Sequence, residues 1–200
     1  MNLEEKREKM KEIRDEVINL KESPLYKYRI LNKYFPVIGQ GDHNAQILFI
    51  GEAPGENEAK TGVPFCGASG KFLDELLAHI KIPRQKVYIA NILKDRPPGN
   101  RDPLQEEIEL YAPFLDRQIE IIEPKVIATL GRFSMDYIMR RYGLENEITK
   151  ISEMHGRIFK TVGPGGEVVI TPLYHPAVAI YNANNRDELK KDFEVLKTLV

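Results

Sequence analysis

The feature that most constrains the fold of this chain is a set of four short apolar runs, each of which leads into a loop rich in special residues. The runs cover residues 46–50, 87–93, 125–130 and 168–173. Runs of this length are typical of strands that are buried on both faces of a parallel sheet. Amphipathic segments with helical spacing separate them, and this alternation predicts an α/β fold with helices covering both faces of the sheet.

The segments between the runs predict five helices and one hairpin. The helices are expected over residues 2–22, from 69 or 70 to 82, over 104–123, from 132 to about 142, and from about 186 to 199. Gly165-Gly166 predicts a hairpin turn between residues 157–162 and 167–172.

One long stretch is expected to be irregular, and the chain is expected to form a single domain. Residues 51–69 are interpreted as a long irregular loop, and residues 25–29 as a basic-aromatic cluster that precedes another loop. The expected organisation is an N-terminal helix, residues 1–23, packed on one domain of residues 24–200.

Composition narrows the possible classes of protein. Lys and Arg number 29 against 30 Asp and Glu, so the net charge of −1 gives no general electrostatic footprint for nucleic acid, although a local basic patch stays possible. The one cysteine, Cys66, cannot build a disulfide framework or a thiolate cluster. No run is long enough to span a membrane, and the charged amino terminus lacks the apolar region of a signal peptide. We therefore expect an intracellular protein that does not bind membranes.

Special residues follow each predicted strand. The four strands end at Gly51-Glu52, at Asn91, at Gly131 and at His175. Ligands of open α/β sheets bind just outside the carboxyl ends of the strands, so these residues are expected to gather at one edge. Taken singly, each is equally compatible with an ordinary strand-to-loop turn. Their joint placement favours a site.

Several kinds of chemistry find no support in the sequence. The glycines from Gly51 to Gly62 have neither the spacing of a dinucleotide fingerprint nor the Gly-Lys-Ser/Thr ending of a phosphate loop. The four histidines are far apart and have no partner at ligand spacing, which argues against zinc. His175 directly precedes Pro176, which biases its backbone to extended geometry and fixes its direction. From local sequence alone, a structural histidine is as good an interpretation as a functional one.

Five motifs resemble, in order and spacing, those of the family 4 uracil-DNA glycosylases. They are Gly51-Glu-Ala-Pro-Gly-Glu-Asn-Glu58, Thr61-Gly-Val-Pro-Phe-Cys-Gly67, Tyr88-Ile-Ala-Asn-Ile92, Arg96-Pro-Pro-Gly-Asn-Arg-Asp-Pro103 and His175-Pro-Ala177. The resemblance runs from about residue 24 to the end of the chain. It implies a three-layer α/β/α fold around a four-stranded parallel sheet, and hydrolysis of the N-glycosidic bond of uracil in DNA.

The resemblance also implies roles for particular residues. Phe65 would stack on the flipped uracil, and Asn91 would hydrogen-bond its Watson–Crick edge and so reject cytosine. Gly51, Glu52 and Ala53 would line the pocket beside the attacking water.

His175 would face the uracil O2, where a neutral imidazole can donate a hydrogen bond to the charge that develops in the transition state. Ala53 offers no side-chain base, so either Glu52 or Asn100 would orient the water. The DNA contacts are expected from cations in the strand-end loops, with an apolar wedge from residues 178–181. These cations are Lys94, Arg96, Arg101 and Arg132.

The largest departure from the family concerns metal. The family usually holds a [4Fe–4S] cluster on four cysteines. The positions that align with these cysteines are Leu20, Ser23, Asp95 and Tyr111 in this chain. None is a thiolate, so we expect no cofactor, and we expect packing or polar contacts to hold the loop between Asp95 and Tyr111 instead.

The sequence thus predicts a monomeric uracil-DNA glycosylase that acts on uracil-containing DNA in a prokaryotic cytoplasm, associated with the nucleoid during repair. Two alternatives stay open. One is the same fold with broader choice of deaminated base, such as hypoxanthine or xanthine. The other is a non-catalytic module that binds uracil or DNA.

Overall fold

The computed structural model describes residues 1–182 and 184–199, and its centre is a six-stranded sheet. The strands are ordered β1-β3-β2-β4-β6-β5. Their bounds are β1 Gln40–Gly41, β2 Ile47–Gly51, β3 Tyr88–Asn91, β4 Val126–Leu130, β5 Phe159–Gly163 and β6 Gly166–Leu173. The inner strands β3, β2, β4 and β6 run parallel, whereas β1 and β5 pair antiparallel at the two edges. The predicted parallel four-stranded core is confirmed, and the predicted hairpin is β5–β6.

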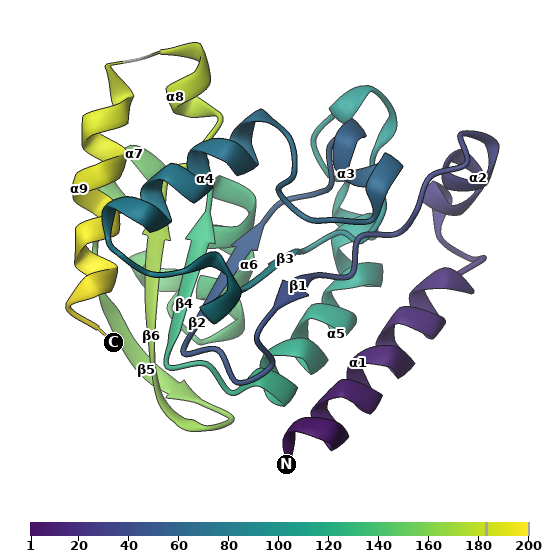
Figure 1. The fold of residues 1–200 in the computed structure, drawn as a ribbon, viewed down its shortest axis with the longest axis horizontal. Helices are drawn as coiled ribbons and strands as arrows, with labels where there is room; N and C mark the ends of the chain where they lie inside the picture. The colour runs from purple at the N-terminus through teal and green to yellow at the C-terminus, as the bar shows by residue number, and fades with distance from the viewer. Residues whose placement is uncertain (183, 200) are drawn as a thin grey trace.

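Helices cover both faces of this sheet (Figure 1). The longer helices are α1 Leu3–Ile18, α2 Pro24–Leu31, α4 Ala68–His79, α5 Gln105–Ile122, α6 Arg132–Arg141 and α9 Asn185–Lys197. The short ones are α3 Glu56–Thr61, α7 Ile151–Met154 and α8 Val178–Tyr181, with 3-10 turns η1 Arg84–Lys86, η2 Pro98–Asn100 and η3 Glu145–Glu147. The three-layer α/β/α arrangement is therefore confirmed.

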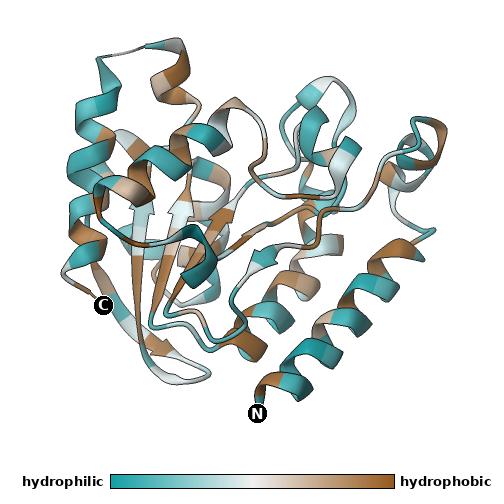
Figure 2. Cartoon of the chain, in the orientation of Figure 1, coloured by the Kyte–Doolittle hydropathy of each residue, from teal (hydrophilic) through white to brown (hydrophobic). Residues whose placement is uncertain are grey.

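Strand alternation explains why there are two apolar layers. In β2, Leu48 and Ile50 point to the cluster that contains buried residues of α1, α5 and α6. Ile47 and Phe49 point the other way, to the cluster formed with α4 and α9. Successive residues of a strand face opposite sides of a sheet, so an unbroken apolar run is what a strand covered on both faces needs. Figure 2 shows brown along most of the central strands, whereas the helices around them carry both teal and brown residues.

The structure contains one helix that the sequence does not predict, α2, and another, α3, inside the stretch that the sequence wrongly predicts to be irregular. Residues 24–31 form α2, because Pro24 occupies the first turn and the Ser23 Oγ accepts the Leu25 N–H at 3.1 Å as the helix cap. The stretch 51–69 contains the short helix α3, which ends at Gly62 with a left-handed φ of 73°.

Helix α1 lies along α5 on the outer side of one helical layer (Figure 1). Its stripe of Met10, Ile13 and Val17 is buried in the same cluster as Leu115 and Ile119 of α5. Among the described residues, no helix combines the length and the apolar character needed to cross a lipid bilayer.

Candidate active site

A cavity of about 320 Å³ opens at the carboxyl edge of the parallel strands. It collects residues from loops that are far apart in the sequence and that follow β2, β3 and β6. Its lining residues are Glu52, Ala53, Pro54, Gly55, Glu58, Phe65, Ser69, Asn91, Pro97, Asn100, Arg101, His175 and Ala177. Seven of the residues singled out from the sequence are among them: Glu52, Ala53, Phe65, Asn91, Asn100, Arg101 and His175. The volume lies in the range of small-molecule sites.

Asn91 presents an unsatisfied acceptor at this cavity. It is the last residue of β3, opposite Gly51 in the parallel register, and its side chain is buried. Its Oδ1 has no hydrogen-bond partner among the described residues. A buried polar atom without a partner is costly, and its presence in a cavity points to a ligand that supplies the missing donor.

Gly51 makes this arrangement possible. A Cβ at this position would collide with the Asn91 Oδ1 and would lie 2.8 Å from the Phe65 ring. Only glycine therefore lets the amide and the aromatic ring approach the end of β2 so closely.

Phe65 is held in a strained backbone conformation. Its φ of 49° is left-handed, which is uncommon for an aromatic residue. The Glu58 Oε1 accepts the N–H groups of Cys66 and Gly67, each at 3.0 Å, and so fixes the turn that follows. At Gly70, a Cβ would collide with the Phe65 carbonyl, so glycine is required there too. Strain retained by such support is typical of functional loops.

His175 has a defined tautomer. Its Nδ1 accepts the backbone N–H of Ala177 at 3.1 Å. Burial lowers its pKa to about 4, so the imidazole is neutral at pH 7. A neutral imidazole whose Nδ1 accepts must carry its proton on Nε2. The ring, 5.6 Å from that of Phe65, therefore offers a fixed N–H donor to the cavity.

Glu52 and Asn100 face the same cavity. Burial raises the pKa of the Glu52 carboxyl to about 7, with the charge of Asp102 adding to the shift and that of Arg132 opposing it. Asn100 has a left-handed φ of 53°, and its Oδ1 accepts from the Arg96 Nε at 2.7 Å. Both residues that the sequence suggested for orienting a water molecule therefore line this cavity.

Lys94 does not lie where the sequence suggested. Its side chain has 0% exposure, and its Nζ donates to the Asn91 carbonyl at 2.8 Å and to the Gln118 Oε1 at 2.6 Å. The prediction that Lys94 contacts DNA phosphates is wrong, because the amine is enclosed between β3 and α5. Burial lowers its pKa to about 7.

The three arginines differ in how they are held. Arg96 is 9% exposed and donates to the Tyr34 hydroxyl at 2.8 Å as well as to Asn100. Arg101 lines the cavity and makes two hydrogen bonds, of 2.9 and 2.6 Å, to the buried Glu107 carboxylate. Arg132 is exposed and pairs with Asp102. Arg101 and Arg132 are therefore accessible to a ligand, and Arg96 chiefly supports the loop.

Two supporting residues were not singled out from the sequence. Glu58 belongs to the Gly51–Glu58 motif, so the motif itself is the signal that could have identified it. Gln118 gives no such signal, because its contact with Lys94 depends on how α5 packs against the end of β3.

The positions that align with the cluster cysteines of the family do not fit a metal cluster. Ser23, Asp95 and Tyr111 meet in the fold, but they are joined by hydrogen bonds of 2.7 and 2.6 Å, and Leu20 is an apolar residue of the same core. A [4Fe–4S] cluster needs four thiolates, and the chain has one cysteine. Within residues 1–182 and 184–199, no group of three or more His, Cys, Asp or Glu side chains is arranged to hold a metal ion.

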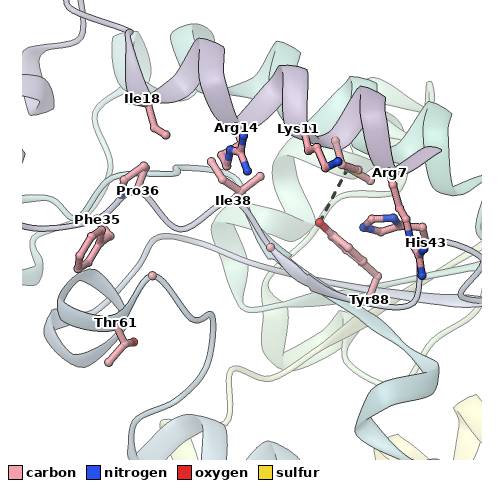
Figure 3. Close-up of a pocket in the computed structure, with 13 residues that line it drawn as sticks. Arg7, Lys11, Arg14, Ile18, Phe35, Pro36, Ile38, His43, Thr61 and Tyr88 are labelled. Atoms are coloured by element: carbon pink, nitrogen blue, oxygen red, sulfur yellow. Dashed lines mark hydrogen bonds between the residues drawn. The ribbon is translucent and has the colours of Figure 1, made fainter. Parts of the chain in front are cut away.

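A second cavity, of about 450 Å³, lies between α1 and the segment 35–39 (Figure 3). Arg7, Lys11 and Arg14 of α1 line one side, and Phe35 and Ile38 line the other. It contains none of the residues that follow the parallel strands. Its larger volume therefore does not make it the better candidate for the active site.

Comparisons with known proteins agree with the geometry. The Uracil DNA glycosylase superfamily model matches residues 38–197. The chain is 44% identical to a Type-4 uracil-DNA glycosylase of Sulfurisphaera tokodaii, over 95% of this chain and 84% of the relative. It is 41% identical to that of Archaeoglobus fulgidus (96% and 94% covered) and 38% identical to that of Thermotoga maritima (85% of each).

Proposed function

This chain belongs to the type-4 uracil-DNA glycosylases of the uracil-DNA glycosylase superfamily, and from that membership we propose how its pocket removes uracil from DNA. The enzyme is a glycosidase of DNA repair. It takes the uracil out of the base stack, at a cost of about a few kcal/mol, and hydrolyses the bond between the base and the sugar. An abasic site is left in the DNA.

Base recognition rests on the unpaired Oδ1 of Asn91, the observation that carries this proposal most directly. Uracil brings an N3–H donor to that acceptor and an O4 acceptor to the amide Nδ2. With the amide in this orientation, cytosine would place its N3 acceptor against the Asn91 Oδ1 and its N4 donor against the Nδ2, so the Oδ1 would stay buried and unpaired. Sites that must hydrogen-bond their substrate reject analogues lacking the donor by about 10⁴-fold or more. Phe65 supplies the stacking surface.

His175 acts on the leaving group. As the C1′–N1 bond breaks, its electrons pass to the uracil ring and the sugar becomes cationic. The neutral imidazole donates its Nε2–H to O2, where negative charge accumulates. A fixed donor of this kind contributes about 10²–10³-fold to the rate.

Water attacks C1′ from the side of Glu52 and Asn100. Asn100 orients the water, and the Glu52 carboxylate accepts the proton that the water loses as its oxygen bonds to carbon. A pKa of about 7 suits a general base that works near neutral pH. The same carboxylate, when ionised, also stabilises the cationic sugar.

DNA is held around the pocket by exposed groups on the same edge. Arg101 now pairs with Glu107, and Arg132 pairs with Asp102. When DNA binds, both arginines exchange some of these contacts for contacts with phosphates. Ile180 of α8, which follows the His175-Pro176 turn and is 46% exposed, fills the space that the flipped base vacates. The enzyme acts as a monomer, in the cytoplasm of a prokaryote, in association with the nucleoid.

The test is release of bases from oligonucleotides that carry uracil, hypoxanthine, xanthine or cytosine at one position. Abasic sites are converted to strand breaks by alkali and counted. We expect breaks at uracil and none at cytosine. No breaks at uracil would overturn the proposed function, and breaks at cytosine equal to those at uracil would overturn the recognition by Asn91. Breaks at hypoxanthine, whose N1–H and O6 match the N3–H and O4 of uracil, would show a broader choice of base.

A further inference from the structure

A buried chain of hydrogen bonds links α2, α5 and the loop after β3. The Ser23 hydroxyl is 2.7 Å from the Tyr111 hydroxyl, which donates to the Asp95 Oδ2 at 2.6 Å. The Arg29 guanidinium donates to both Asp95 oxygens, at 3.0 and 3.1 Å. All four side chains are buried.

The direction of each hydrogen bond follows from the number of protons available. Tyr111 has one hydroxyl proton and uses it on Asp95, so the Ser23 hydroxyl must donate to the Tyr111 oxygen. Ser23 in turn accepts the Leu25 N–H at the start of α2. A continuous, fully satisfied network of this kind polarises its members and specifies one geometry.

Arg29 extends the network to α1. Its guanidinium also donates to the carbonyl of Val17 at 3.0 Å and to that of Ile18 at 2.5 Å, the last residues of α1. One side chain therefore ties the end of α1, the helix α2 and the carboxylate of Asp95 together.

Asp95 stands immediately before the loop that faces the pocket. The next residue, Arg96, bonds the Asn100 side chain, and Asn100 and Arg101 line the cavity. Tyr111 lies in α5, beyond the far end of the same loop. The Tyr111–Asp95 hydrogen bond thus closes the loop at its base.

We propose that Arg29, Asp95 and Tyr111 are positioning residues that set the place of Asn100 and Arg101 in the pocket. Asp95 and Tyr111 occupy positions that align with cysteines of the family's [4Fe–4S] cluster, which this chain cannot bind. The hydrogen-bonded network thus lies where the family usually holds the cluster. The inference rests on the proposed function for its kinetic consequence, but the position of the loop can be measured without any activity.

Two variants disrupt the network, and a third restores part of it. Tyr111→Phe removes the hydroxyl that joins Ser23 to Asp95 and keeps the aromatic ring in the core. Arg29→Met leaves Asp95 without its cation, and Arg29→Lys restores the charge without the planar fork. The matched control is Tyr137→Phe, which removes a similar hydroxyl that bonds Asp116 at 2.8 Å between α6 and α5.

Two readouts are taken at a temperature at which circular dichroism shows every variant folded. The first is hydrogen exchange, by mass spectrometry, of a peptide that spans residues 95–104. The second is the single-turnover rate of uracil release at saturating enzyme. We expect Tyr111→Phe and Arg29→Met to speed exchange of this peptide and to lower the release rate about tenfold or more. Arg29→Lys should recover part of both, and Tyr137→Phe should match wild type.

The outcomes distinguish an error in the positioning role from an error in the proposed function. Exchange and release at wild-type levels in folded Tyr111→Phe and Arg29→Met would overturn the positioning role, since a merely structural network would lower only the melting temperature. If wild type releases no uracil, the proposed function fails, while faster exchange in the two variants would still support the positioning of the loop. If Arg29→Met does not fold, Tyr111→Phe alone decides.

Discussion

At the scale of single residues, burial lowers the pKa of the His175 imidazole and raises the pKa of the Glu52 carboxyl, both for the same physical reason. It disfavours the charged form of each, so the pKa of His175 falls to about 4 and that of Glu52 rises to about 7. His175 is consequently neutral at pH 7, and its Nδ1 contact with Ala177 leaves Nε2–H as the donor. Pairs of titratable groups with such separated pKa values are typical of acid–base sites.

The pH dependence of the reaction tests the role of Glu52. A base works when ionised, and Glu52 ionises as the pH rises through about 7. We expect the single-turnover rate to rise between about pH 6 and 8 and then level, whereas His175 titrates too low to contribute in this range. Glu52→Gln should be slower and should lose this rise.

The control for that measurement is Glu8→Gln, which removes an exposed carboxylate of α1 and should keep the wild-type profile. A rise of the same size in Glu52→Gln would assign the titration to another group. Asn100 would then orient the water without a carboxylate base.

At the scale of elements, the sequence predicts those parts that depend on local pattern. The buried strands follow from unbroken apolar runs, and α4, α5 and α9 follow from apolar residues at helical spacing. Helices α2 and α3 escape this reasoning because they are short and their signal lies in the residues that cap them, Ser23 and Gly62. Strand β1 pairs through backbone atoms of Gln40 and Gly41, which leave no trace in hydropathy.

The residues of the candidate site likewise fall into those that the sequence predicts and those that only the packing reveals. Glu52, Asn91 and His175 could be predicted because each lies at or within two residues of the carboxyl end of a strand, and parallel strands bring these ends to one edge. Lys94 could not, because a lysine in a loop is ordinarily solvated. Only the packing of Gln118 from α5 reveals that its amine supports the carbonyl of Asn91.

Burial of Lys94 predicts a measurable dependence of stability on pH. Its pKa is about 7 in the folded protein and 10.5 as the ordinary value, so between these limits the unfolded chain binds more protons. The free energy of unfolding therefore rises with pH, by about 2 kcal/mol from pH 7 to 9 for this group. In urea titrations at the two pH values, Lys94→Met should lack this increment.

Lys71→Met, which alters an exposed lysine of α4, is the control and should keep the increment. Equal pH dependence in wild type and Lys94→Met would mean that the buried amine stays protonated throughout this range.

At the scale of the whole molecule, the parallel sheet brings the pocket residues to one edge. The N-terminal helices α1 and α2 are connected to the base of a loop that lines the pocket. Residues 1–31 contribute nothing to the lining of the pocket. Arg29 nevertheless connects α1 and α2 to Asp95, at the start of the loop whose residues do line it. The fold of the family is thus retained with polar contacts in place of a metal cluster.

This view predicts that the purified protein carries no iron–sulfur cluster, because one cysteine cannot replace four thiolates. Iron and acid-labile sulfide should be far below one per chain, and the visible absorbance of an iron–sulfur protein should be missing. A [4Fe–4S] ferredoxin treated identically is the positive control. Stoichiometric iron would contradict the account of residues Ser23, Asp95 and Tyr111.

The central claim is that Asn91 and His175 form a uracil-excising pocket at the carboxyl edge of the sheet. The measurement that tests it most directly is the single-turnover rate of uracil release by wild type, Asn91→Ala and His175→Ala, with DNA affinity measured in parallel. We expect release by wild type, a loss of about 10²–10³-fold in His175→Ala and a comparable loss in Asn91→Ala, with DNA affinity nearly unchanged. Release by both variants within a few-fold of wild type would contradict it.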